Sequence, residues 1–236
     1  MSLRGLRLAP TLITLLIVLT CLALGVWQLE RLQWKRGLID ERETAIAAPP
    51  VALPRTAAEA RGMQFRRVVA EGVFLHHKEI FVATPSARGA GFDVLTPFRE
   101  ADGHILFVNR GFVPSQLKDP KTRAAGEIEG TVRVAGLLRF PPDEKPGRFF
   151  PDNRADINYW FWVDLPAMAA ADGLDNVAPF YIEADATPNP GGWPLGKPAT
   201  VELPNNHLQY AITWFSLAVG MVVVYIVSQR QGRRSL

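Results

Sequence analysis

The sequence predicts a two-pass α-helical membrane protein with a β-rich domain, a small barrel or sandwich with one short helix, between its two helices. Two charge-free stretches, between Arg7 and Glu30 and between Glu202 and Arg230, predict the helices. Each is long enough to cross a bilayer, which takes about 20 helical residues. The intervening chain carries most of the charge and nearly all the prolines. Its many short β-branched and aromatic runs predict strands.

The chain of 236 residues is therefore expected to hold one water-exposed domain between two membrane anchors. A proline-rich stretch after the first helix marks the linker into that domain. The predicted parts, in order, are a cytoplasmic N-terminus (1–10), a first transmembrane helix (11–29), a helix extension and proline-rich linker (30–54), a periplasmic β-rich domain (55–204), a second transmembrane helix (205–228) and a basic cytoplasmic tail (229–236).

Short runs separated by Gly, Pro and Asp predict the strands of the central domain. Gly130–Arg139 alternates most clearly, and Val132, Val134 and Leu138 are expected to face the core. Only Asp164–Gly173 is predicted to form a helix, with its glycine as the C-terminal stop. The other predicted strands are Phe65–Leu75, Glu79–Thr84, Phe92–Phe98, His104–Asn109, Tyr159–Val163, Pro179–Ala184 and Ala199–Leu203.

The first apolar stretch has two interpretations. Arg4 and Arg7 precede it, and Ala23-Leu24-Gly25 resembles a small-x-small cleavage site, as in a signal peptide. However, the apolar stretch exceeds the usual length of a signal-peptide core and continues past that site to Leu29. We therefore predict an uncleaved anchor, with a cleaved signal peptide as the alternative.

The charges that flank the second helix predict the orientation. The stretch from Ser228 to Leu236 contains three arginines and no acidic residue, whereas Glu202 precedes the helix on its other side. The positive-inside rule then places the C-terminus in the cytoplasm. Two spans return the N-terminus to the same side, and the central domain is expected outside the cytoplasm.

Composition and motifs argue against several classes of function. The net charge of +3 reflects the basic flanks of the helices, and no motif for nucleic-acid binding is present. Cys21 is the single cysteine, so an intrachain disulfide cannot form. The sequence contains no nucleophile elbow, paired Cys-x-x-Cys or phosphate-binding glycine loop. His76-His77-Lys-Glu79 contains metal-ligating residue types, but adjacent strand residues point to opposite faces, so a polar strand end is predicted. We expect no enzymatic activity.

The beginning of the second helix is unusually polar and aromatic. Asn206 is a plausible N-cap, and His207, Tyr210, Ala211 and Trp214 share one helical face. The helix macrodipole disfavours an imidazolium in the first turn, so a neutral histidine suited to bind a metal or haem iron is expected there. The alternative is that the aromatic residues are interfacial anchors and the histidine is a polar flank.

The end of the first helix offers a complementary set of residues. Trp27, Arg31 and Trp34 lie at i, i+4 and i+7 and share a face. If both helices span the membrane, this face and His207 lie at the same leaflet. Arg31 is then placed to bind an anionic group, such as a haem propionate, at the water interface. Two aromatic belts with a snorkelling arginine are the alternative.

Three separated motifs resemble the Surfeit locus protein 1 family. They are Gly25-x-Trp-Gln-x-x-Arg-x-x-Trp-Lys35, Val108-Asn-Arg-Gly-Phe-Val-Pro114 and Asn206-His-Leu-Gln-Tyr-x-x-Thr-Trp214. The resemblance runs nearly end to end and includes Pro146-Gly-Arg-Phe-Phe-Pro151 and Pro179-Phe-Tyr-Ile182. Members of this family help to assemble cytochrome c oxidase in mitochondria and aerobic bacteria.

The resemblance implies an assembly factor that binds or stabilises haem a during its insertion into the haem-bearing subunit of cytochrome c oxidase. Its expected haem-binding residues are His207 as the axial ligand, Tyr210, Trp214 and Trp27 as apolar walls, and Arg31 near the propionates. A cofactor-free membrane scaffold that binds oxidase subunits is the alternative.

The same resemblance implies where the protein acts and what it contacts. Besides the haem-bearing oxidase subunit, the expected partners are the lipid bilayer and the enzyme that synthesises haem a, and no nucleic acid. The basic N-terminus without a mitochondrial presequence favours a bacterial inner membrane, with the central domain in the periplasm.

Overall fold

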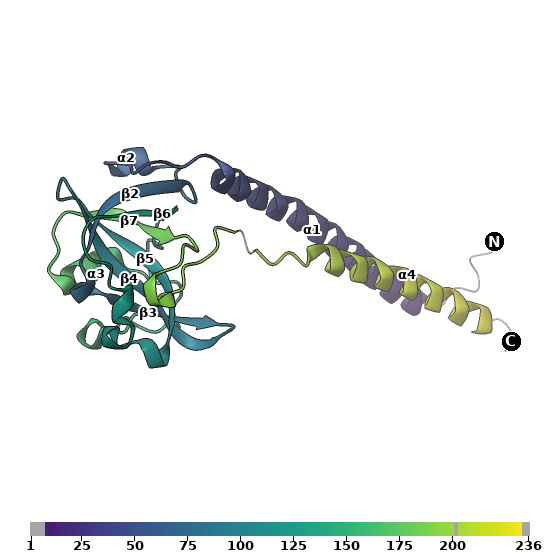
Figure 1. Ribbon diagram of the computed structural model, residues 1–236. Helices are drawn as coiled ribbons and strands as arrows, with labels where there is room; N and C mark the ends of the chain where they lie inside the picture. Colours follow the sequence, from purple (N-terminus) through teal and green to yellow (C-terminus); the bar gives the residue numbers. More distant parts are fainter. Residues whose placement is uncertain (1–7, 201–202, 233–236) are drawn as a thin grey trace. The chain divides into compact units, whose positions relative to one another are not determined.

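The computed structural model describes residues 8–200 and 203–232. By their contacts, the residues form two units. One contains the second long helix and most of the first, up to Glu41, and the other comprises Arg42–Thr200. The predicted fold class is confirmed, because two long apolar helices flank a β-rich barrel domain with a short helix. Figure 1 shows the order of these elements. The helices are α1 (Leu8–Ala47), α2 (Ala57–Ala60), α3 (Leu165–Asp172) and α4 (His207–Gly232).

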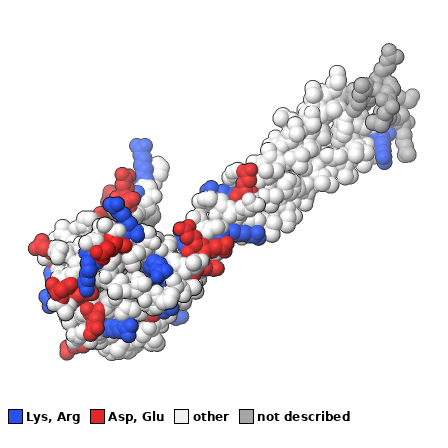
Figure 2. Space-filling model, turned by 90° about the horizontal axis from the view of Figure 1, so that it is seen from above, with Lys and Arg blue, Asp and Glu red and all other residues white. Residues whose placement is uncertain are grey.

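The two long helices have the length and composition of membrane spans. Both α1 and α4 contain an apolar window long enough to cross a bilayer. Most of their large apolar side chains are exposed in the isolated chain, as expected of residues that contact lipid. In Figure 2 the surface along these helices is largely without charge, whereas acidic and basic side chains are scattered over the β-rich unit.

The β-rich unit is built on one seven-stranded sheet, in the order β1-β2-β6-β7-β5-β4-β3. A further pairing between β2 and β4 closes this sheet on itself, through Gly72–Phe74 and Phe98–Glu100. The strands β2, β6, β7, β5 and β4 thus form a closed barrel in the described part of the chain. The strands are β1 (Val51–Ala52), β2 (Arg67–Phe74), β3 (Ile80–Ser86), β4 (Gly89–Glu100), β5 (Ile105–Pro114), β6 (Val132–Arg139) and β7 (Val177–Ala184).

Alternate residues of these strands fill the barrel, as the period of two predicts. Val134 and Leu138 of β6 belong to this core, as expected, and Val132 packs against it partly buried. The short helix α3 covers a second cluster around the fully buried Trp160. Asp164 caps α3 by accepting a hydrogen bond from the amide of Ala167 at 3.1 Å. The predicted helix at Asp164–Gly173 is therefore confirmed.

Three sequence predictions about local structure differ from the structure. The segment Tyr159–Val163 was predicted to be a strand, but it forms only isolated bridges, between Trp160 and Val82 of β3 and between Tyr159 and Arg154. Trp160 packs against β3 and β4 in the second cluster, and Tyr159 packs against Phe92 of β4. His76–Lys78 forms a 3₁₀ turn, η2, instead of a strand end. Of the predicted strand Ala199–Leu203, residues 201–202 lie outside the described residues, and the rest is not in a strand.

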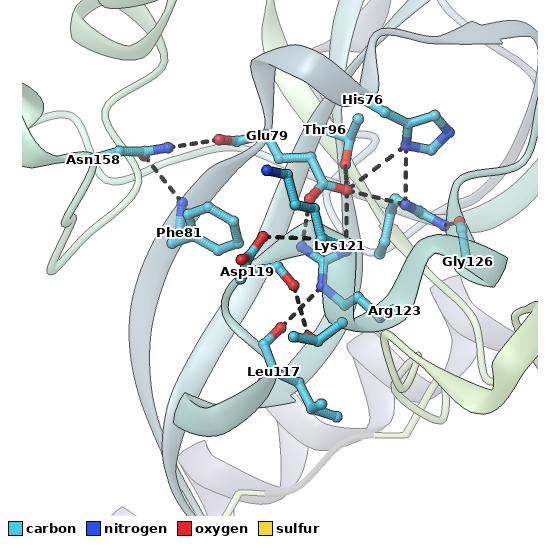
Figure 3. Close-up of polar contacts among 12 residues, drawn as sticks. His76, Glu79, Phe81, Thr96, Leu117, Asp119, Lys121, Arg123, Gly126 and Asn158 are labelled. Carbon is cyan, nitrogen blue, oxygen red and sulfur yellow. Dashed lines mark hydrogen bonds and ion pairs between the residues drawn. The ribbon is translucent and has the colours of Figure 1, made fainter.

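A buried carboxylate joins three separate segments of the barrel (Figure 3). Glu79 lies just before β3, and its side chain is only 1% exposed. Arg123 of the η4 segment (Pro120–Gly126) donates to both of its oxygens, and Arg110 of β5 donates to Oε1 at 3.2 Å. Thr96 of β4 donates to the same oxygen at 3.4 Å. Since the arginines also bind the backbone carbonyls of Leu117 and Gly126, the cluster fixes the path of η4 against the sheet.

The protonation state of Glu79 follows from this environment. Burial alone raises the pKa of a carboxyl, but hydrogen bonds from His76 and Arg123 and the charges of Arg123 and Arg110 outweigh it. Together they lower the pKa of Glu79 from 4.5 to about 2. Because the folded-state pKa is depressed, the stabilisation is complete above pH about 4.5 and is lost as the pH falls towards about 2.

Gly111 permits a close approach between β5 and the segment that leads out of the barrel. The backbone of Phe112 and that of Leu195 exchange two hydrogen bonds of 2.9 Å. Gly111 has φ of +110°, and an added Cβ would collide with the carbonyl group of Leu195. Only glycine satisfies both the backbone conformation and the spacing at this position.

We predict that Glu79→Gln lowers the free energy of unfolding by about 3–5 kcal/mol at neutral pH, because two buried guanidinium groups lose their counter-charge. Thermal and urea unfolding of the detergent-purified protein, followed by circular dichroism, measures this. The loss of stability between pH about 4.5 and about 2 should also diminish in the variant. Asp156→Asn, in an exposed ion pair with Arg154, is the control and should change little. Equal effects of the two substitutions would contradict this role of Glu79.

We predict that Gly111→Ala destabilises the barrel unit by about 3 kcal/mol, through backbone strain and the collision with Leu195. The unfolding midpoint in urea measures the effect. Gly147→Ala is the matched control, because its added Cβ would meet open space. A Gly111→Ala protein as stable as the control would show that the segment around Leu195 moves away at little cost.

Candidate functional site

The helices α1 and α4 lie side by side (Figure 1). They meet along one stripe of residues on each helix. On α1 the buried residues are Cys21, Gly25, Gln28 and Leu32, at successive intervals of four, three and four. On α4, Ala211 and Ala218 are buried at an interval of seven. This spacing is typical of helices that pack in the manner of an antiparallel coiled coil.

Small residues bring the two helices close together. A Cβ added to Gly25 would lie 2.5 Å from the ring of Phe215 of α4, so the ring occupies the space that a larger side chain would need. Close packing of small residues is the usual source of association between helices in membranes. The position of Gly25 therefore sets the separation of α1 and α4 one turn away from Gln28.

Three polar contacts accompany the apolar stripe. Near one end, the hydroxyls of Thr11 and Tyr225 lie 2.7 Å apart. Near the other end, Nδ1 of His207 lies 2.7 Å from Oε1 of Gln28. The ammonium group of Lys35 donates to the carbonyl of Pro204, just before α4 begins. The candidate site is at this second end, where α4 starts.

The residues predicted to form the site differ in how far they are buried between the helices. His207, the first residue of α4, faces α1 and is half-buried, and Trp214 is half-buried one heptad further along. Tyr210 and Trp27 are 56% and 51% exposed, at the edges of the stripe. Arg31 is exposed, and its guanidinium lies 4.0 Å from the ring centroid of Trp34. Thus His207 contacts α1 directly through Gln28, whereas Tyr210, Trp27 and Arg31 are exposed.

The contact that the sequence reasoning missed is made by Gln28. Gln28 is 9% exposed and lies on the stripe of α1 that meets α4. The sequence had pointed to the neighbouring face of α1, which carries Trp27 and Arg31. The spacing of Cys21, Gly25, Gln28 and Leu32 in the sequence predicts that they share one helical face. An amide on a face that is otherwise small and apolar is the signal that could have identified Gln28. Which residue of α4 it meets depends on the pairing of the helices.

The histidine has the donor chemistry of a single metal ligand. Within residues 8–200 and 203–232, the contact with Gln28 is the one hydrogen bond of the His207 ring, so Nε2 is without a hydrogen-bond partner there. The described residues contain no group of three or more His, Cys, Asp or Glu side chains arranged to hold a metal ion. A site here would therefore suit a metal that brings most of its own ligands.

The sequence of this chain matches a known protein family over most of its length. Residues 15–219 match the model of the SURF1 family. The chain is 39% identical to the SURF1-like protein of Monosiga brevicollis over 223 residues, which are 89% of this chain and 83% of that protein. It is 36% identical to Surfeit locus protein 1 of Homo sapiens over 87% of this chain and 73% of that protein.

A third relative, Surfeit locus protein 1 of Takifugu rubripes, is 37% identical over 220 residues, which cover 86% of this chain and 90% of that protein. The family match runs from within α1 through the barrel into the first half of α4, and it includes the three motifs at Gly25–Lys35, Val108–Pro114 and Asn206–Trp214. The resemblance inferred from those motifs is therefore confirmed: the chain is a member of the SURF1 family.

Proposed function

We propose that this protein is a cytochrome c oxidase assembly factor that holds haem a during its insertion into the haem-bearing oxidase subunit. In this proposal His207 provides the axial ligand to the haem iron. The SURF1 family is known for assembly factors of this oxidase and is not a catalytic family. Membership supports the general role, and the geometry at the start of α4 supports the specific one.

The observation that carries the haem proposal is the state of the His207 ring. Its Nδ1 is engaged by Gln28 at 2.7 Å, while its Nε2 has no hydrogen-bond partner in the described chain. A porphyrin supplies four nitrogen ligands, so haem iron needs from a protein only one or two axial side chains. A single histidine in a membrane helix pair fits haem better than it fits a metal ion that requires several side chains.

The surrounding residues fit the rest of a haem molecule. Tyr210 and Trp27 expose broad apolar surfaces at the edges of the helix pair, and Trp214 lies half-buried on the same side of α4 as His207. We assign these aromatic residues as walls for the porphyrin. Arg31 is exposed beside Trp34, where its guanidinium is free to bind a carboxylate such as a propionate. When bound, haem a would supply the redox-active iron that the oxidase requires.

We place both termini in the cytoplasm and the barrel unit in the periplasm of a bacterial inner membrane. The basic residues after α4 and at the start of the chain support this orientation by the positive-inside rule. The site at the start of α4 then lies at the outer membrane surface. The enzyme that makes haem a and the haem-bearing oxidase subunit are the proposed partners there.

A cofactor-free scaffold for oxidase subunits is the second candidate. It is favoured by the loop Pro146–Pro151, in which Phe149 is 97% and Phe150 39% exposed. Two adjacent exposed phenylalanines are more typical of a binding surface than of a solvated loop. In this alternative the helix pair serves as an anchor and the His207–Gln28 contact only stabilises it.

We predict that His207→Ala protein, purified in detergent from cells that produce haem a, loses most of the haem absorption band while its membrane insertion and yield are unchanged. The ratio of the haem band to the protein absorbance measures occupancy. His77→Ala, which removes an exposed histidine of the barrel unit, is the matched control and should keep full occupancy. Full occupancy in His207→Ala would remove the ligand assignment, and wild-type protein without haem would favour the scaffold.

We predict that a fluorescent protein fused after Leu236 is fluorescent and that alkaline phosphatase fused there is inactive. The reason is that the C-terminal arginines stay in the cytoplasm, where alkaline phosphatase does not become active. Paired fusions to a fluorescent protein and to alkaline phosphatase test this in bacterial cells. Fusions of both reporters within the loop at Gly147 serve as the control and should give the opposite pattern. Phosphatase activity of the C-terminal fusion would reverse the proposed orientation.

A further inference from the structure

The contact between Gln28 and His207 is short and partly buried. The two residues are separated by 179 positions in the chain, and their side-chain atoms Oε1 and Nδ1 lie 2.7 Å apart. Gln28 is buried in the stripe of α1 that faces α4, and His207 is half-buried. A hydrogen bond of this length in a water-poor environment is electrostatically stronger than one in water.

The chemistry of the two groups determines the position of the proton. An amide oxygen only accepts hydrogen bonds, so Nδ1 of His207 carries the hydrogen and donates it to Gln28. In a neutral imidazole the other nitrogen, Nε2, then holds the lone pair. That is the nitrogen that can bind a metal, and the hydrogen bond at Nδ1 makes it a better electron donor.

The packing around Gln28 keeps this hydrogen bond in place. Gly25, three residues earlier on the same stripe, admits the ring of Phe215 and thereby brings the helices close. Leu32, one turn later, is buried on the same stripe. Lys35 binds the carbonyl of Pro204 just before α4, which fixes the start of that helix against α1. The amide of Gln28 therefore has little freedom to turn away from His207.

We propose that Gln28 is a positioning residue that fixes the tautomer and ring orientation of His207 and so prepares Nε2 to bind haem iron. This proposal rests on the function proposed above, but the tautomer it specifies exists without haem. A neutral amide serves this purpose at the membrane surface because it accepts a hydrogen bond without bringing a buried charge.

The test measures the tautomer in the full-length protein without haem. Nitrogen-15 NMR of histidine-labelled protein in detergent separates protonated from unprotonated ring nitrogens, and the His207→Ala spectrum identifies His207 among the four histidines. We expect Nδ1 to be protonated in the wild type. Gln28→Leu should yield a mixture or the opposite tautomer, whereas Gln28→Glu, which keeps an acceptor, should restore protonation at Nδ1. Gln33→Leu, at an exposed position of α1, is the matched control.

A haem titration of the same variants gives the second measurement. Gln28→Leu should weaken haem binding by about 10–100-fold, the usual effect of removing a group that orients a metal ligand, and Gln28→Glu should recover most of it. An unchanged tautomer in Gln28→Leu would overturn the inference whatever the haem titration shows. If Gln28→Leu does not fold, Gln28→Asn, whose shorter side chain cannot reach, carries the same expectation.

The two proposals fail in different ways. If wild-type protein binds no haem but the tautomer depends on Gln28, the proposed function fails and the positioning of His207 stands. If His207→Ala loses haem while Gln28→Leu retains both the wild-type tautomer and wild-type affinity, the role of Gln28 fails and the haem proposal stands.

Discussion

The buried carboxylate of Glu79 is the constraint on which the rest of the barrel unit depends. A charge with 1% side-chain exposure is tolerated only when cations and hydrogen-bond donors replace its water. Arg110 and Arg123 therefore have to be held at fixed positions on β5 and η4, and each in turn binds backbone carbonyls. One ion cluster thus fixes how the segment after β5 lies against the sheet, which the hydrophobic core alone would leave less specific.

The motif Val108–Pro114, which helped to reveal the family, owes its residue types to this structure. Asn109 is buried, accepts a hydrogen bond from the amide of Gly111 at 2.9 Å and donates to Asp93 at 3.3 Å. Arg110 binds Glu79, and Gly111 admits the chain at Leu195. This family motif therefore specifies the barrel, whereas the motifs at the ends of the two long helices supply the candidate site.

In the helix pair the physical problem is different, because lipid provides no hydrophobic drive between helices. Close packing at Gly25 and hydrogen bonds such as that between Gln28 and His207 contribute to their association instead. The same polar contact that stabilises the pair leaves Nε2 of the histidine without a hydrogen-bond partner in the described chain. In the proposed function, one hydrogen bond would thus serve both the association of the helices and the preparation of a haem ligand, which would account for a histidine at the start of an otherwise apolar helix.

The sequence by itself determined the features that depend on local pattern: the two apolar helices, most of the strands, the capped helix at Asp164–Gly173 and the place of His207 in the first turn of the second helix. Charge-free length, a period of two and capping residues are properties of neighbouring positions, so they can be read along the chain. Only the tertiary structure decided that Trp160 contacts β3 without forming a strand, that Glu79 is bound by two distant arginines, and that Gln28 is the partner of His207. The physical reason is that these contacts join residues far apart in sequence, and their pairing depends on the closure of the sheet and the register of the helices.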